Sequence, residues 1–91
     1  MTDPEIRFDE AAGRLELVVE GRPCELDFRL EDGAMVITHT GVPPALEGRG
    51  LAGRLMQAAV ELARERGWQL IPVCSYAASW LRRHPQALAG P

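Results

Sequence analysis

A glycine-rich segment near the middle of the chain is the first feature that could do chemistry. Gly48, Gly50 and Gly53 surround the expected start of a helix, directly after Pro43-Pro44. Glycine lets the backbone turn sharply and approach a ligand closely, and the first amides of a helix have no partner within it. Together with the helix dipole these amides form an anion site, for which a pyrophosphate is the natural guest. An ordinary turn is the alternative, since the Lys of a Walker loop and the spacing of a dinucleotide fingerprint are both absent.

Two other side chains could act on a bound reactant. Histidine is the side-chain type that most readily exchanges a proton at neutral pH, so His39 could serve as a base. We expect it on a strand, on the same face as Met35 and Ile37. Cys74 precedes a predicted helix, whose N-terminus would lower the pKa of the thiol and make it reactive. The alternatives are a partly buried structural histidine and a buried cysteine that packs as a small apolar residue.

The first forty residues predict strands. Apolar and polar residues alternate strictly from Cys24 to Leu30, which is typical of an antiparallel strand with one wet face. Gly21-Arg22 is the expected hairpin connection, and Glu31-Asp32-Gly33 is the next turn. The expected strands are Ile6–Asp9, Arg14–Glu20, Cys24–Leu30 and Ala34–Gly41. They predict a four-stranded antiparallel meander.

The second half predicts helix, strand and helix. The expected helix Leu51–Arg66 carries an apolar stripe made of Leu51, Leu55, Ala58, Ala59 and Leu62. Trp68–Val73 predicts a strand covered on both faces, or nearly so, in which Pro72 argues for a strand end or an edge. Ser75–Arg83 is a short helix, and residues 86–91 are expected to fray. The order β-β-β-β-α-β-α predicts an α+β fold whose fourth and fifth strands are parallel, with a right-handed crossover.

Composition limits the function classes. The 91 residues suit one domain, and 46% hydrophobic and 25% charged residues are typical of a globular chain. The net charge of −3 argues against a nucleic-acid binder. Two cysteines are too few for a disulfide framework or a metal knuckle, so we expect no metal. Because no apolar run suits a membrane span or a signal peptide, a cytoplasmic location is expected.

The glycine-rich segment belongs to a more specific pattern. Glu47-Gly48-Arg49-Gly50-Leu51-Ala52 resembles the acyl-CoA-binding signature of the GNAT N-acetyltransferase superfamily, Gln/Arg-x-x-Gly-x-Gly/Ala. It follows a similar strand exit, Val42-Pro43-Pro44. The chain looks like the short, single-domain YjdJ-type branch, in which T-H-T…V-P…G-x-G-x-A/G…P-x-C-x-Y…L-R-R-H-P recurs between His39 and Pro85. Glu47 departs from the pattern, because Gln or Arg is usual there.

The resemblance implies a minimal GNAT core that binds acetyl-CoA. The pantetheine arm would lie where the fourth and fifth strands splay apart, and the pyrophosphate would sit on the amides of residues 49–53. His39 would be the general base, and Cys74 either a nucleophile or the general acid. Arg49 and Arg54 would offset the charge of Glu47. The implied cofactor contacts are Val42, Glu47, Gly48, Arg49, Gly50, Leu51, Ala52, Gly53, Arg54 and Tyr76.

The acceptor and the alternatives stay open at this point. An amine is implied, either a peptide or protein lysine or a small polyamine, and the acidic balance favours a cationic acceptor. Tyr76 is a second candidate acid, although a packed tyrosine is the commoner role. We expect a monomer or a weak homodimer. The competing hypotheses are a CoA-binding module without catalysis and a thioesterase-like activity with water as acceptor.

Overall fold

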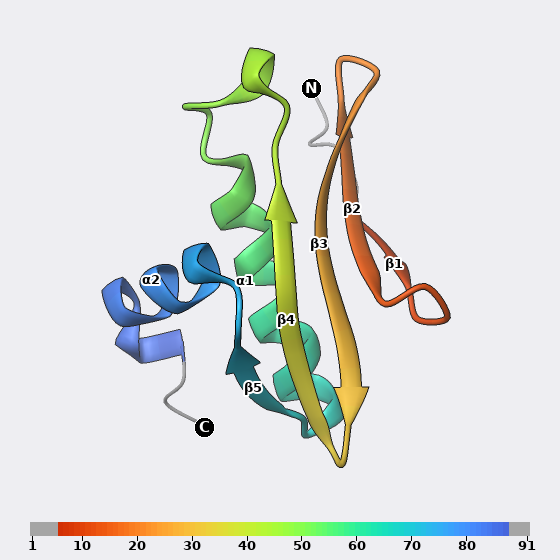
Figure 1. Ribbon diagram of the computed structural model, residues 1–91, viewed down its shortest axis with the longest axis vertical. Coiled ribbons are helices and arrows are strands. Elements are labelled where there is room, and N and C mark those ends of the chain that lie inside the picture. Colours follow the sequence, from red (N-terminus) through yellow and green to blue (C-terminus); the bar gives the residue numbers. More distant parts are fainter. Residues whose placement is uncertain (1–5, 88–91) are drawn as a thin grey trace.

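The computed structural model describes residues 6–87, in which five strands form one sheet in the order β1-β2-β3-β4-β5 (Figure 1). The strands are β1 (Ile6–Asp9), β2 (Arg14–Val19), β3 (Arg22–Glu31), β4 (Ala34–Gly41) and β5 (Gln69–Pro72). The helices are α1 (Leu51–Arg66) and α2 (Ser75–Arg83), with short 3-10 turns η1 (Pro44–Leu46) and η2 (Pro85–Ala87). The first four strands are antiparallel and β5 is parallel to β4, so the predicted α+β fold is confirmed.

Two tight turns close the long hairpins. Glu20 and Gly21 both have positive φ, 53° and 74°, and Asp32 and Gly33 repeat this at 49° and 76°. Paired positive φ values are the mark of a two-residue turn whose twist matches that of the strands. The expected turn at Gly21-Arg22 is therefore wrong by one residue. Arg22 is already paired with Val19, so β3 begins there.

Helix α1 covers one face of the sheet and packs against β2, β3, β4 and β5 (Figure 1). Its predicted bounds are confirmed, and Gly67 caps its end with φ 71°. Three of the five residues in the predicted apolar stripe are buried, but the buried face of the helix is rotated relative to the predicted one. Ala58 and Leu62 are only half-buried, whereas three positions outside the stripe are buried. The buried residues of the helix are Leu51, Leu55, Met56, Ala59, Val60 and Ala63.

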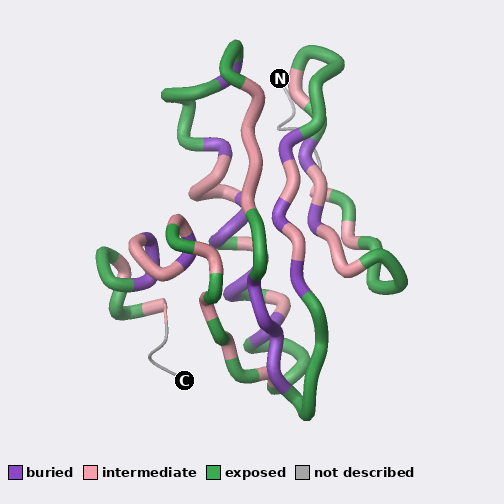
Figure 2. Tube along the Cα trace, viewed as in Figure 1, coloured by how far each residue is buried: buried purple, intermediate pink, exposed green. Residues whose placement is uncertain are grey.

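The core lies between α1, α2 and the sheet, and Figure 2 shows buried segments along β2, β3 and the first half of β4. Leu17, Cys24 and Leu26 are fully buried, and the expected packing role of Cys24 is confirmed. Leu30 continues the same alternation but is exposed. The opposite face of β2 and β3 carries the polar residues Arg14, Glu16, Glu25 and Asp27 and is called the open face below.

Strand β5 forms an edge of the sheet, as Pro72 indicated. The prediction that both faces of this strand are covered is wrong, since the side chains of Ile71 and Val73 are 39% and 62% exposed. Helix α2 packs against β4, β5 and α1 and contributes Trp80 and Leu81 to the core. The inner face of β5 is therefore protected and its outer face is not.

The structure describes two residues of the C-terminal segment that was expected to fray. Residues 86–87 belong to η2, and the carbonyl of Ala87 accepts a hydrogen bond from Arg64 Nη2 at 3.1 Å. The rest of the expected frayed tail, residues 88–91, lies outside the described residues. Between residues 6 and 87, neither helix combines the length and apolar character that crossing a bilayer requires.

Candidate active site

Strands β4 and β5 separate at Ile37. The amides of Val73 and Cys74 both donate to the Ile37 carbonyl, at 2.9 and 3.0 Å. The pairing ends there, at Ile37 opposite Pro72. Strand β4 runs on to Gly41, while the other chain turns into α2. The sheet therefore opens on this side of β4, which is the splay that the resemblance implied.

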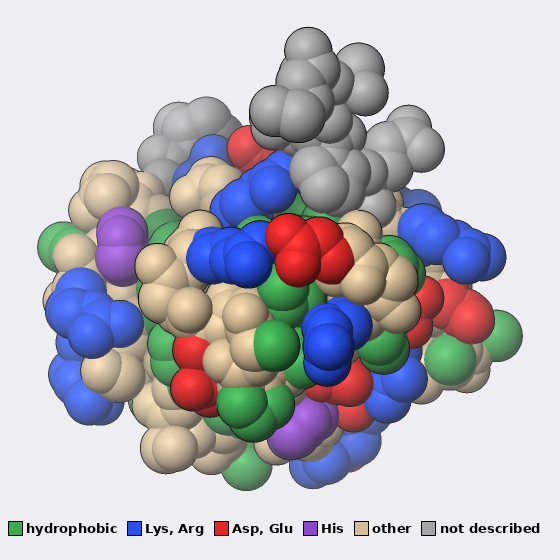
Figure 3. Space-filling view, turned by 90° about the horizontal axis from the view of Figure 1, so that it is seen from above, with side chains coloured by type: hydrophobic (Ala, Val, Ile, Leu, Met, Phe, Trp, Pro, Cys, Tyr) green, Lys and Arg blue, Asp and Glu red, His purple; other side chains and the backbone are tan. Residues whose placement is uncertain are grey.

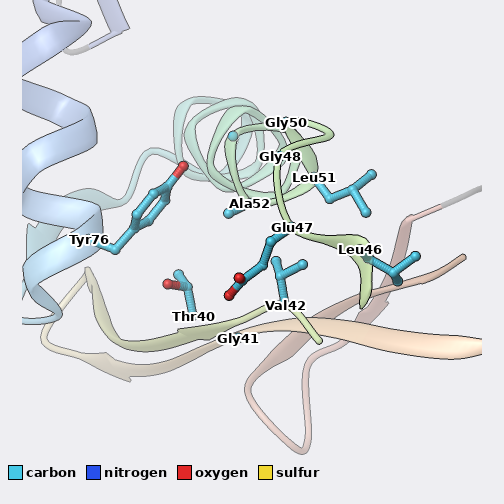
Figure 4. Close-up of a pocket in the computed structure, with 11 residues that line it drawn as sticks. Thr40, Gly41, Val42, Leu46, Glu47, Gly48, Gly50, Leu51, Ala52 and Tyr76 are labelled. Carbon is cyan, nitrogen blue, oxygen red and sulfur yellow. The ribbon is translucent and has the colours of Figure 1, made fainter. Parts of the chain in front are cut away.

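A cavity of about 420 Å³ adjoins this opening, between the end of β4 and the start of α1 (Figure 4). Eight of the ten predicted cofactor contacts line it. The lining residues are Thr40, Gly41, Val42, Leu46, Glu47, Gly48, Gly50, Leu51, Ala52, Gly53 and Tyr76. Thr40, Gly41 and Leu46 were missed, because nothing in their residue types points to a ligand. A volume of this size is within the range of small-molecule sites.

The start of α1 presents backbone amides at one wall of this cavity. Gly50 is the N-cap residue and has φ 75°, and Gly48 has φ 84°. No side chain caps the helix start, and its first turn carries no acidic residue. The first helical hydrogen bond runs from the Arg54 amide to the Gly50 carbonyl, so the amides of residues 51–53 precede the helical ladder. This is the arrangement that favours an anion.

The two arginines expected near the phosphates do not line the cavity. Arg49 Nη1 instead lies 2.8 Å from Glu20 Oε2, in the turn between β2 and β3, and the arginine lowers the pKa of that carboxyl by hydrogen bonding. Glu47 does line the cavity, and Figure 4 shows its carboxylate pointing inward, towards Thr40. The expected charge compensation of Glu47 by the side chain of Arg49 is therefore wrong.

Cys74 lies beside the cavity, next to β4. Its Sγ is 3.7 Å from Thr40 Oγ1. Burial by itself would raise the pKa of the thiol, but hydrogen bonds from the Ala77 amide, the Thr40 hydroxyl and further amides outweigh burial and leave the pKa lowered. The expected lowering at the start of α2 is thus confirmed. At Cys24, in contrast, burial raises the pKa of the thiol.

Tyr76 lines the cavity from the side of α2, and its ring points towards the start of α1 (Figure 4). Burial raises the pKa of its hydroxyl, which is therefore protonated at neutral pH. A methyl group on Gly53 would lie 3.9 Å from this hydroxyl and 3.4 Å from Trp80 Nε1. Gly53 thus marks the place where the two helices approach each other beside the cavity.

An extra residue in β4 turns His39 away from the cavity. Phe28 is opposite Ile37 and Asp27 is opposite His39, so the register shifts and Thr38 is left over. Residues directly opposite each other share a face of the sheet. His39 therefore shares the open face with Asp27, and its side chain is 57% exposed. The prediction that it lies on the face of Met35 and Ile37 is wrong.

The same shift gives Thr40 the place that His39 was expected to occupy. Thr40 is opposite Leu26, which is buried on the side of the helices. The two predicted catalytic residues are therefore not side by side. Cys74 contacts Thr40 on the cavity side. His39, which directly precedes Thr40 in the chain, is on the open face.

Charges of both signs surround this end of the molecule. Figure 3 views the molecule from above the loops at the top of Figure 1, and in the coloured part of that face acidic and basic side chains alternate. No extended basic area is seen there, in keeping with the formal charge of −3.

A parallel strand pair that opens beside a glycine-rich helix start defines a small α+β protein with an anion site at the wall of a cavity. The family model described as GCN5-related N-acetyl-transferase matches residues 14–89. The chain belongs to this family, and the resemblance to the GNAT superfamily is confirmed. It is an acetyltransferase.

A solved structure supports the same assignment. The solution structure of a "GCN5-like putative N-acetyltransferase" from Staphylococcus aureus is similar with a TM-score of 0.76 and 29% sequence identity. The match covers 96% of this chain and 86% of that chain. Among curated proteins, no match was found.

Proposed function

We propose that the protein transfers an acetyl group from acetyl-CoA to an amine, with His39 as general base and Cys74 as nucleophile or general acid. The observation that carries the proposal is the cavity where β4 leaves β5, lined by the glycine-rich segment. The family supports acetyl transfer in general terms.

The residues present fit acetyl-CoA. The amides at the start of α1 and the left-handed Gly48 and Gly50 suit a pyrophosphate, because nothing lies within 4 Å of where a side chain at either glycine would begin. The apolar wall formed by Val42, Leu46 and Leu51 suits a pantetheine arm. Among the described residues that line the cavity, the carboxylate of Glu47 is the one group that opposes an anionic cofactor. When bound, the cofactor supplies an acetyl thioester.

His39 would remove a proton from the acceptor nitrogen, since an amine must be neutral to attack a thioester. On the open face it would meet an acceptor that reaches β4 from the side opposite the helices. Cys74 would act from the cavity side. Its lowered pKa increases the thiolate fraction at neutral pH, which favours attack on the thioester and an acetyl-cysteine intermediate. In direct transfer it would instead protonate the leaving sulfur.

The acceptor class we propose is a cationic amine, either a protein lysine or a polyamine. The open face supports this assignment, because Glu16 and Glu25 lie opposite each other on β2 and β3 near His39, while Asp27 is held by Arg14. A carboxylate-rich surface attracts a protonated amine before it is deprotonated. The two acceptor classes are compared by measuring the rate of CoA release with spermidine and with a lysine peptide as the acceptor.

Thermal unfolding with and without acetyl-CoA tests the binding step. Ligand at about 100 times its Kd adds about 2.7 kcal/mol, which raises the midpoint on the order of 10 °C in a domain of this size. Gly50→Asp should abolish the shift, because its carboxylate faces the anion site. Gly67→Asp is the matched control: it places the same residue at a left-handed position at the other end of α1.

A shift in the wild type and in Gly67→Asp, but not in Gly50→Asp, supports the cofactor site. No shift at millimolar acetyl-CoA would overturn it. If the shift occurs and no amine is acetylated, the chain is a CoA-binding module. If CoA is released without any amine, water is the acceptor and the activity is that of a thioesterase.

A further inference from the structure

The open face holds a pair of side chains that the acetyl-transfer site does not include. Glu25 on β3 and His39 on β4 approach each other, with 3.9 Å between Oε2 and Nε2. The carboxylate is the less exposed partner, at 24% against 57% for the imidazole. This is an ion-pair distance, longer than a hydrogen bond.

Gly41 provides the space in which the two side chains meet. It is the residue opposite Glu25 across the two strands. A methyl group at this position would overlap the Glu25 carboxylate and would lie 3.0 Å from His39 Nε2. Gly41 is not among the glycines with positive φ, so its backbone does not require glycine. The absence of a side chain serves the approach of Glu25 to His39.

The other charged side chains nearby do not pair with Glu25, so His39 is its partner. Asp27, the next carboxylate along the same face of β3, is bound through both oxygens by Arg14, at 2.7 and 3.2 Å. Glu16 is directly opposite Glu25 on β2, and like charges in that position repel. In the part of the chain that the structure describes, His39 is the one basic side chain at ion-pair distance from Glu25.

We propose that Glu25 is the positioning residue for His39 and that it holds the imidazole with its proton on Nε2, leaving Nδ1 to accept the proton of the acceptor amine. A carboxylate beside one imidazole nitrogen sets the tautomer and stabilises the charge that forms. The inference rests on the proposed acetyl transfer. His39 Nδ1 takes one proton from the protonated amine, and the neutral nitrogen forms the N–C bond as the C–S bond of the thioester breaks. The second proton of the nitrogen is lost to solvent, and the released thiolate takes a proton from Cys74 or, when Cys74 is the nucleophile, from solvent.

The tautomer of His39 tests the proposal without any assumption about the acceptor. The ¹⁵N shifts of the two histidines show which nitrogen carries the proton at a pH where the rings are neutral. His84 is an internal standard, because its Nδ1 lies 2.8 Å from the Trp80 carbonyl, which can only accept a hydrogen bond. We expect the Nε2–H form at His39 and the Nδ1–H form at His84.

Two different variants should disturb His39 in the same way. Glu25→Ala removes the carboxylate, and Gly41→Ala displaces it while leaving every functional group in place. Both should mix the His39 tautomers, and the double variant should be no worse than either single one. Glu16→Ala is the matched control for the tautomer, since it removes an equal charge one strand further from His39; its loss should leave the His39 tautomer and kcat as they are and should change only KM, through weaker attraction of the acceptor. Circular dichroism and the acetyl-CoA melting shift verify that each variant is folded and binds.

Kinetics on spermidine gives the functional readout. Carboxylates that orient a histidine in metal sites are worth about 10- to 100-fold, and this exposed pair should lie at the lower end, near tenfold in kcat with KM little changed. Unchanged tautomers and kcat in both Glu25→Ala and Gly41→Ala would overturn the proposal. A loss shared by Glu16→Ala and confined to KM would overturn it too, as it would indicate general attraction of the acceptor. Failure of the wild type to bind acetyl-CoA would instead overturn the proposed function and leave the tautomer result standing.

Discussion

The hydroxyl of Thr40 lies 3.7 Å from the sulfur of Cys74 and joins two segments that are no longer paired as strands. This contact helps to lower the pKa of the thiol. Thr40→Val keeps the shape of the side chain but removes the hydroxyl. A hydrogen bond is worth about 0.5–1.5 kcal/mol, so the thiolate fraction of Cys74 should fall about two- to tenfold at neutral pH. The alkylation rate by iodoacetamide measures this.

Thr38→Val is the control for that variant. Thr38 is on the same strand, but its hydroxyl donates to the Asp27 carbonyl at 3.3 Å and not to the sulfur. Cys74 should react in Thr38→Val as it does in the wild type. Equal alkylation rates in Thr40→Val and the wild type would show that the hydroxyl does not act on the thiol.

The two cysteines should differ in reactivity over a wide pH range. Hydrogen bonds lower the pKa of Cys74, whereas burial raises the pKa of Cys24 and shields it. The alkylation rate of Cys74 should rise at a lower pH than the rate of an ordinary thiol does. Cys24 should react only when the protein unfolds. Mass spectrometry of the peptides separates the two. Rapid labelling of Cys24 in the native protein would contradict the fully buried position.

The lowered pKa of Cys74 also affects stability. Because the folded-state value is below the unfolded one, the thiolate stabilises the fold above the unfolded pKa. This contribution is lost as pH falls through the lowered folded pKa. Cys74→Ala should therefore flatten the pH dependence of the free energy of unfolding in that window, as measured by urea denaturation. An identical pH dependence in both proteins would contradict it.

Gly53→Ala should stabilise the protein. Gly53 is in the first turn of α1, and its added methyl would meet Trp80 Nε1 at 3.4 Å, an ordinary contact. Glycine within a helix costs about 0.5–1 kcal/mol relative to alanine, so urea denaturation should show a gain of that order. Gly53→Leu would instead push α2 away and destabilise the fold. A loss of stability in Gly53→Ala would mean that the two helices cannot accept even a methyl group between them.

Glu47→Gln should tighten the binding of acetyl-CoA. The carboxylate points into the cavity and repels an anionic cofactor (Figure 4). Two charges near 4 Å in water interact by about 1 kcal/mol, so Kd should fall by up to about fivefold, and less at high salt. Isothermal titration calorimetry measures this. Glu65→Gln, which removes the same charge from the exposed far end of α1, should leave Kd unchanged; weaker binding by Glu47→Gln would assign the carboxylate a favourable role.

Much of this architecture could be predicted from local residue patterns. The bounds of β4, α1 and α2 follow from the turn at Gly33, the glycines at either end of α1 and the His84-Pro85 stop. The glycine-rich wall of the cavity could be predicted for the same reason, since glycines and free helix amides act over a few neighbouring residues.

The position of His39 could not be predicted in this way. Counting by twos along β4 assigns it to the inner face, and one unpaired residue, Thr38, reverses every later side chain. Such a bulge depends on the partner strand, which the residues around His39 do not record. The direction of Arg49 was wrong for a similar reason, because Glu20 is 29 residues away along the chain.

Pro72 has a consequence for the behaviour of the protein in concentrated solution. The amides of Gln69 and Val73 bond inward to β4, so the alternate residues of β5, Leu70 and Pro72, face the free edge. Proline has no N–H to offer, which leaves Leu70 as the outward donor of this short strand. A strand from another molecule could therefore accept a hydrogen bond only from the Leu70 amide along this edge, which is too little for regular strand pairing. The exposed side chains of Ile71 and Val73 would otherwise make this edge a starting point for aggregation, and one proline protects the molecule against it.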